Sequence, residues 1–161
     1  LIDEGLRFEL RVHGGAPFQA DSFKDEIARL FKKTAPSVQQ RGAYRREDIA
    51  DLIAAVDCTI VPSIWWENAP LVIGEAQSQR KPVITSNIGG MAEMVQDGVN
   101  GITVSPNDAR ALAAAMRRMA ENPDLRRRLS ANARKPNDID TTARRYLALI
   151  DAIVPRETAA A

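Results

Sequence analysis

The sequence is poor in the residues that build metal sites and covalent cross-links. Its 161 residues include one cysteine, Cys58, and one histidine, His13. This composition excludes a disulfide framework and a zinc site built from histidine and cysteine. Cys58 lies inside an apolar run, which predicts an inert core thiol in a reducing compartment.

An excess of charge of one sign and a long hydrophobic run are also lacking. The formal net charge of +1 argues against a nucleic-acid binder, because such proteins are usually clearly basic. No apolar run approaches about 18 residues and no signal peptide is visible, so we expect a soluble, cytoplasmic protein. The chain begins without methionine in the loop-like LIDEG, so we expect a fragment of a longer protein.

Two common nucleotide-binding motifs are missing as well. No G-x-G-x-x-G follows the first apolar run, and no G-x-x-x-x-G-K-[ST] occurs anywhere. These absences count against a standard dinucleotide site and against a P-loop.

What the sequence does contain is an alternation of short apolar runs with amphipathic stretches, which is typical of parallel strands joined by crossover helices. With 45% hydrophobic residues, the chain can form one compact core. We therefore predict an α/β fold, a three-layer, doubly wound parallel sheet of Rossmann-like type, as a single domain over residues 1–154 with a disordered tail over 155–161. Strands are predicted at about 7–13, 38–41, 58–61, 82–85 and 101–104, and helices at 21–33, 46–56, 70–79 and 91–96, followed by two helices after residue 107 and a last one at 139–153 that closes the domain.

Helix caps are readable near the C-terminus. Asn107 or Asp108 is expected to cap the first of the two helices, and Asn122 the second, with Pro123 at its first position.

The turns that follow three predicted strands are unusual, and ligands of doubly wound sheets bind at these carboxyl ends. The turns read HGGAP, PSIWWENAP and SNIGGMAEM. The pairs Gly14-Gly15 and Gly89-Gly90 allow close backbone approach and bare amide donors, as phosphate sites require. The helices beginning near Pro70 and Met91 add N-terminal amides. Either pair alone could be a tight turn, but together they favour a nucleotide or sugar-phosphate pocket.

Two acids, Glu67 and Glu75, flank the start of one predicted helix. Glu67 lies in the preceding loop and Glu75 in the second turn. A carboxylate that accepts from two vicinal hydroxyls is the usual way to hold a ribose or hexose. The alternatives are a favourable charge near a helix N-terminus for Glu67 and an ordinary exposed position for Glu75.

The stretch ENAPLVIGEA after VPS, with the later KPVITSNIGGMAEMVQDGVNGITVSPND, resembles the C-terminal, donor-binding domain of the family-4 retaining glycosyltransferases, which have the GT-B fold. The similarity spans residues 8–134, and the acid pair matches the E-x7-E motif of that family.

This resemblance implies transfer of a sugar, with retention, from a nucleotide diphosphate sugar to an acceptor. Glu67 would act as the catalytic-site acid that contacts hydroxyls of the donor sugar, and Glu75 would hold the ribose. No metal or cofactor would be needed. The remaining donor-binding residues would be Gly14, Gly15, Arg41, Tyr44, Asn68, Ala69, Pro70, Leu71, Val72, Gly89 and Gly90.

Two departures from the family pattern matter. Pro70 stands where many members have glycine, so one amide contact to the donor is lost. The Arg and Lys that grip the diphosphate, and the acceptor-binding N-terminal domain, belong to segments before Leu1, so the isolated chain is expected to be inactive. A missing edge strand would also leave an exposed backbone ladder.

The D-x-D at Asp138 and Asp140 mimics a metal-binding motif, but its place at the start of the last helix favours capping.

Alternatives to a transferase are a non-catalytic nucleotide-sugar-binding module and a sugar-nucleotide epimerase of the same architecture. Both acids argue against the first, and the E-N-x-P-L-V-x-x-E phrasing against the second. The resemblance also suggests bacterial-type cell-surface polysaccharide biosynthesis. The terminal helices are basic, which fits either a solvated surface or peripheral contact with anionic lipid at the inner face of the membrane. Their basic residues are Arg117, Arg118, Arg126, Arg127, Arg128, Arg134, Lys135, Arg144 and Arg145.

Overall fold

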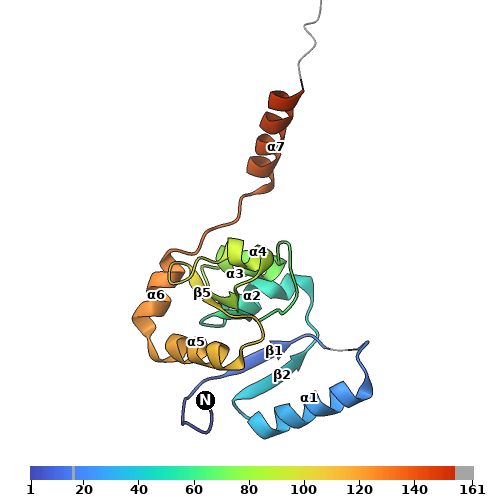
Figure 1. Ribbon diagram of the computed structural model, residues 1–161, viewed down its shortest axis with the longest axis vertical. Coiled ribbons are helices and arrows are strands. Elements are labelled where there is room, and N and C mark those ends of the chain that lie inside the picture. The colour runs from blue at the N-terminus through green and yellow to red at the C-terminus, as the bar shows by residue number, and fades with distance from the viewer. Residues whose placement is uncertain (16, 155–161) are drawn as a thin grey trace, which may run out of the picture.

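The computed structural model describes residues 1–15 and 17–154 (Figure 1). The tail predicted over 155–161 lies outside the described residues. In chain order the elements are β1 (Leu10–His13), α1 (Asp21–Thr34), β2 (Val38–Gly42), the 3-10 helix η1 (Arg46–Asp48), α2 (Ile49–Ala54), β3 (Thr59–Val61), α3 (Leu71–Ser78), β4 (Val83–Ser86), α4 (Gly89–Met94), β5 (Gly101–Val104), α5 (Ala109–Glu121), α6 (Pro123–Ala131) and α7 (Ile139–Ile153).

Every strand pair is parallel, which confirms the predicted α/β class, but the strands form two sheets. One contains β1 and β2, and the other has the order β3-β4-β5. The expectation of one continuous sheet is therefore wrong for these residues. β1 and β3 do not pair with each other, and a cleft separates them.

The core belongs to the larger sheet. Its central strand β4 is the run VITS, and all four of its residues are buried, as expected for a parallel strand covered on both faces. Successive side chains of a strand point to opposite faces. Ile84 accordingly packs in a cluster with Met119 and Leu129 of α5 and α6, and Val83 in a second cluster with Ile73 of α3.

The smaller sheet adds little to this core. Helix α1 buries none of its residues, and within the described ranges the buried apolar side chains all fall between Ile53 and Leu129. An ion pair between Glu4 and Arg117 of α5 connects the N-terminal segment to the larger sheet. A core that is continuous through all the predicted elements is therefore not what the described residues form.

The predicted caps are confirmed near the C-terminus. The Asp108 carboxylate accepts from the amides of Arg110 and Ala111 at 3.0 and 2.9 Å. The Asn122 side chain accepts from Leu125 at 2.8 Å, with proline next in the chain. Asp138 of the D-x-D accepts from the Thr141 amide at 2.7 Å, and that hydrogen bond lowers the pKa of its carboxyl group.

Helix α7 has the predicted bounds but not the predicted packing. It extends away from the body of the molecule (Figure 1) and buries none of its residues. Apolar side chains including Tyr146, Ile150 and Ile153 are exposed along it. The expectation that this helix closes the domain is wrong, because the helix lies apart from the body of the molecule.

Cys58, at the entry to β3, behaves as the predicted inert thiol. Burial raises its pKa to about 11, and the negative charge of Asp57 adds to the increase. Little reactive thiolate is therefore present near neutral pH.

Two threonines on neighbouring strands give a matched test of buried polar groups. The Thr85 hydroxyl donates to the Val61 carbonyl at 2.9 Å, whereas the Thr59 hydroxyl is buried without a partner among the described residues. We expect Thr85→Val to lower the free energy of unfolding by about 1 kcal/mol, because a hydrogen bond is lost. Thr59→Val should instead raise it by about 1 kcal/mol, because an unsatisfied hydroxyl is removed. Urea unfolding of the 161-residue chain measures both, and equal losses in the two variants would contradict the assignment.

Candidate functional site

The loops after β3 and β4 lie side by side at the carboxyl edge of the larger sheet. Val61 pairs with Thr85, so the two strands end at the same level. The first loop carries Glu67 and the second carries the Gly89-Gly90 pair at the start of α4. The Gly90 amide donates to the Glu67 carbonyl at 2.8 Å, which joins the two loops directly.

The glycine pair is required by this close approach. A Cβ atom on Gly90 would lie 1.5 Å from the Asn68 carbonyl oxygen, where no atom can fit. Gly89 has a φ of +53°, and a Cβ there would lie 2.8 Å from the Glu67 carbonyl oxygen. A side chain at either position would push the Glu67 loop away from the sheet.

This packing corrects the expectation of a bare amide at Gly90. The Gly90 amide is already used by the Glu67 carbonyl, and Gly90 itself is buried. Helix α4 begins at Gly89 rather than near Met91, and it has only six residues. The pair therefore positions the acidic loop.

Glu67 is half-buried, and its carboxylate has no hydrogen-bond or ion-pair partner among residues 1–15 and 17–154. Its own amide donates to the Trp65 carbonyl at 2.9 Å, which tightens the loop. Trp65 and Trp66 are 75% and 74% exposed beside it. The acid is thus held by its backbone, and its side-chain oxygens remain able to accept from a ligand.

Glu75 lies on the second turn of α3 and lines the cleft between the two sheets, which has a volume of about 610 Å³. Val72, Tyr44 and His13 line the same cleft. The rings of His13 and Tyr44 meet edge to face at 5.9 Å. Within the described part of the chain, nothing pairs with the Glu75 carboxylate either.

The start of α3 connects the two acids. Pro70 is buried at the cap position and has no amide hydrogen to offer, while Asn68 and Ala69 are exposed before it. Leu71 and Val72 provide first-turn amides that have no partner within the helix. The predicted residues 67–72 and Glu75 therefore occupy one continuous stretch at the edge of the sheet.

Three predicted site residues lie apart from the two acids, and two of them have other partners. The Gly14 amide donates to the Gly42 carbonyl at 2.7 Å, so it is not bare, and Gly15 is exposed beyond β1. The Arg41 side chain pairs with Glu9 at 3.2 Å. Within residues 1–15 and 17–154, no hydrogen bond or ion pair joins these residues to either acid, and their assignment to the donor site stays a prediction.

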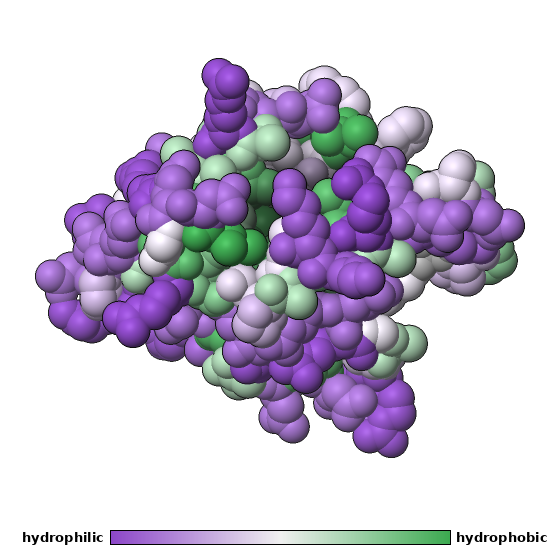
Figure 2. Space-filling model, turned by 90° about the horizontal axis from the view of Figure 1, so that it is seen from below, coloured by the Kyte–Doolittle hydropathy of each residue, from purple (hydrophilic) through white to green (hydrophobic). Residues whose placement is uncertain are grey.

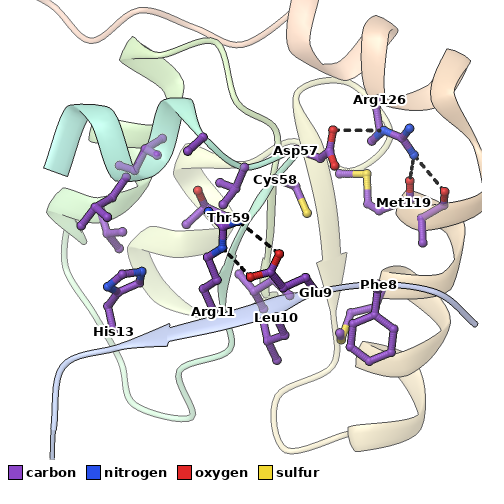
Figure 3. A pocket seen from close by; sticks show the side chains of 18 of the residues that line it. Phe8, Glu9, Leu10, Arg11, His13, Asp57, Cys58, Thr59, Met119 and Arg126 are labelled. Atoms are coloured by element: carbon purple, nitrogen blue, oxygen red, sulfur yellow. Dashed lines mark hydrogen bonds and ion pairs between the residues drawn. The ribbon is translucent and has the colours of Figure 1, made fainter. Parts of the chain in front are cut away.

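The sequence does not reveal how much of the cleft wall comes from β1. Figure 3 shows Leu10 and Arg11 on β1 across the cleft from Cys58 and Thr59, with Phe8 and Glu9 leading into the strand. Arg126 of α6 also lines it, donates to the Ala120 carbonyl at 3.0 Å and lies 3.8 Å from Asp57. The alternating residue pattern of β1 predicts a strand. It does not predict which element lies beside the edge of that strand.

Several basic side chains of the terminal helices are engaged in ion pairs. Arg117 pairs with Glu121 as well as Glu4, and Arg127 pairs with Asp124. Over the described ranges, no helix has the length and apolar character needed to cross a membrane. The same ranges contain no cluster of three or more His, Cys, Asp or Glu side chains suited to a metal ion.

Curated proteins similar to this chain are glycosyltransferases. A D-inositol 3-phosphate glycosyltransferase of a Nocardioides species is 38% identical over 100 residues, which are 62% of this chain and 22% of the relative. Glycogen synthase of Mycobacterium tuberculosis is 36% identical over 115 residues, covering 66% and 28%. The aligned part therefore spans about a quarter of these relatives.

Solved structures agree with this. HepE from Anabaena, in complex with UDP, has a TM-score of 0.81 and 25% identity, and covers 90% of this chain and 41% of its own. Sucrose-phosphate synthase from Thermosynechococcus elongatus has a TM-score of 0.76 and 28% identity, covering 90% and 38%. These neighbours confirm the fold that the sequence predicts, the Rossmann-like half of a GT-B glycosyltransferase.

The sequence model of the family described as "Glycosyl transferases group 1" matches residues 19–136. That match covers both strand-end loops, both acids and the glycine pair. The resemblance found in the sequence is thereby confirmed, and the chain belongs to the glycosyl transferases group 1 family.

Proposed function

We propose that this chain is the donor-binding half of a retaining glycosyltransferase, which moves a sugar from a nucleotide diphosphate sugar to an acceptor. The observation that carries the proposal is a pair of carboxylates, Glu67 and Glu75, on either side of the start of α3, neither of which has a partner among the described residues. The carbonyl of Glu67 is held by Gly90, so the first acid has a defined position. One carboxylate before α3 and another in its second turn can each accept hydrogen bonds from a separate set of ligand hydroxyls.

The nucleotide is assigned to the Glu75 side of this stretch. The ribose hydroxyls would donate to the Glu75 carboxylate, and Tyr44, which lines the same cleft, would stack on the base. Solved neighbours contain UDP and UDP-glucose, which supports a uridine nucleotide as the first ligand to test.

The sugar and diphosphate are assigned to the Glu67 side. Glu67 would hold hydroxyls of the donor sugar, and the amides of Leu71 and Val72 would face the diphosphate. Amides fixed before the reaction stabilise the charge that develops on a leaving phosphate. Pro70 has no amide hydrogen, so this chain has one backbone hydrogen-bond donor fewer than the family pattern. We expect no metal or cofactor to be needed.

The acceptor would be held by a partner domain of the same, longer protein. Orientation of acceptor against donor supplies a large part of the rate of such a transfer, so the 161 residues alone should bind donor without transferring it. We also propose that the protein is cytoplasmic and takes part in cell-surface polysaccharide synthesis. For peripheral membrane contact, the exposed Arg118 and Arg128, which have no ion pair within the described residues, are the best support.

The role of Glu75 is tested in the longer enzyme by calorimetric titration with UDP. Glu75→Ala should weaken binding by about 1.5 to 3 kcal/mol, the scale of hydrogen bonds to a charged group. The control is Glu26→Ala, which removes an exposed carboxylate of α1 and should leave the affinity unchanged. If the unmutated enzyme bound UDP and its 2′,3′-dideoxy analogue equally well, the ribose assignment would be lost.

The Gly90 contact is tested by two alanine substitutions. Gly90→Ala should destabilise the protein by about 3 kcal/mol and abolish UDP binding, because the new Cβ overlaps the Asn68 carbonyl. Gly74→Ala is the matched control. Its Cβ would meet the Pro136 Cγ atom at an ordinary 3.5 Å, and alanine is favoured inside a helix. Urea unfolding and UDP titration of both variants measure these effects. A Gly90→Ala protein as stable as the Gly74→Ala protein would refute the contact.

A further inference from the structure

The loop between β3 and α3 exposes large apolar side chains at the carboxyl edge of the larger sheet. Trp65 and Trp66 are largely exposed, and so are Ile64 before them and Leu71 at the start of α3. Exposed apolar groups gathered in one short stretch mark a site of interaction. In the chain they flank Glu67, whose carboxylate has no partner among the described residues. The loop thus offers aromatic rings together with a hydrogen-bond acceptor.

The Trp66 ring lies beside the first turn of α4. A Cβ atom on Gly89 would lie 3.4 Å from Cε3 of this ring, so the ring approaches the backbone where the glycine leaves space. The Glu67 amide donates to the Trp65 carbonyl at 2.9 Å, and the Glu67 carbonyl accepts from Gly90 at 2.8 Å. The backbone on both sides of Trp66 is therefore fixed, while most of the indole surface remains in solvent. A ring held in place before binding loses little freedom when a ligand packs on it.

Helix α3 separates this ring from the second acid. Glu75 lies on the side of α3 that lines the cleft between the two sheets. Figure 2 shows an apolar hollow on the face seen from below, the side on which β1 and β2 lie in Figure 1. The opposite side of α3 packs on α4, since the Gln77 side chain donates to the Met94 carbonyl at 2.9 Å. Trp66, beside the start of α4, is therefore on the other side of α3 from Glu75.

These positions give an order to the groups at the edge of the sheet. In the proposed function Glu75 holds the ribose, the first-turn amides of α3 face the diphosphate, and Glu67 holds the donor sugar. Trp66 follows next, on the α4 side of Glu67 and away from the nucleotide. A group that packs on Trp66 therefore lies beside the donor sugar and is not part of the nucleotide.

The indole face and its polar neighbours suit a sugar ring. A pyranose carries C–H bonds on its faces and hydroxyls around its edge. The C–H bonds pack on the indole, whose face carries partial negative charge, and the hydroxyls can bond the exposed side-chain amide of Asn68. An acyl chain would cover the ring but leave the nearby amide and carboxylate without partners, which is costly when water is excluded.

We propose that Trp66 binds a sugar ring of the acceptor by stacking, so that the acceptor of this enzyme is a glycoside. The inference rests on the proposed function, because it takes the sugar held by Glu67 to be the donor. It adds the chemical class of the second substrate, which the two acids alone leave open.

The sequence contains two tryptophans, so the ¹⁵N-labelled 161-residue chain gives two indole N–H signals by NMR. Trp65→Phe and Trp66→Phe assign them. The probes are the methyl β-D-pyranosides of glucose and galactose and methyl α-D-mannopyranoside. Sorbitol is the control ligand, because it offers hydroxyls without a ring. We expect at least one glycoside to shift the Trp66 signal more than the Trp65 signal, and sorbitol to shift neither.

Three results would overturn the proposal. The first is a Trp66 signal that none of the three glycosides moves. The second is a shift with sorbitol as large as that with the glycosides. The third is a Trp66 signal that changes on dilution of the protein alone, since a second copy of the chain would then cover the ring.

Alanine substitutions locate the stacking ring. Trp66→Ala should weaken binding of the glycoside by about three- to tenfold, the scale of aromatic contacts, as followed by the Asn68 amide signal. Trp66→Phe should keep most of the affinity, because an aromatic face remains. Trp65→Ala removes an indole of nearly equal exposure and is the matched control, which should leave the affinity unchanged. Equal losses in the two alanine variants would contradict the assignment to Trp66.

Titration with UDP and UDP-glucose separates this inference from the proposed function. Trp66→Ala should bind both ligands as the unmutated chain does. A loss of affinity for UDP-glucose but not for UDP would place the donor sugar on the ring and overturn the acceptor assignment. If UDP did not bind the unmutated chain, the donor site would be lost, although glycoside shifts at Trp66 would still report a sugar site. If UDP bound at Glu75 and no glycoside moved the Trp66 signal, only the present inference would be lost.

Discussion

The hydrogen bond from the Gly90 amide to the Glu67 carbonyl, 2.8 Å long, holds together two loops that are far apart in the sequence. It forms only because residues 89 and 90 have no side chains, which lets the backbone of 67–68 lie directly on the first turn of α4. This loop positions the Glu67 carboxylate and the start of α3. It also positions the exposed side chains of Trp65 and Trp66.

The buried strand β4 in turn fixes the position of these loops. Its side chains anchor α3 and α4 on one face and α5 and α6 on the other, so the helices cannot shift without disturbing the core. The smaller sheet has no comparable anchor, since α1 buries no residue and the cleft lies between β1 and β3. Glu67, in the loop after β3 of the larger sheet, is therefore held more firmly than the part of the cleft wall that His13 and Tyr44 form.

Local chemistry was predictable from sequence where a few neighbouring residues decide it. Asp108, Asn122 and Asp138 cap the helices they were expected to cap, and the strand at 101–104 has its predicted bounds. Features that depend on distant partners were not predictable. Glycine's poor helix propensity hid the true start of α4 at Gly89, and nothing in the amphipathic pattern of α7 shows what covers its apolar face. The division into two sheets escaped prediction because alternation marks a strand but not its neighbour.

The central claim is that Glu67, Glu75 and the start of α3 form one donor site, and amide chemical-shift mapping with UDP tests it most directly. In a titration of the ¹⁵N-labelled 161-residue chain, the account predicts amide shifts gathered at Tyr44, at residues 67–69, 71 and 72, and at Glu75. The affinity should be weak, in the high micromolar to millimolar range, about −4 to −5 kcal/mol. Shifts confined to the terminal helices, or to β2 and α1, would contradict it.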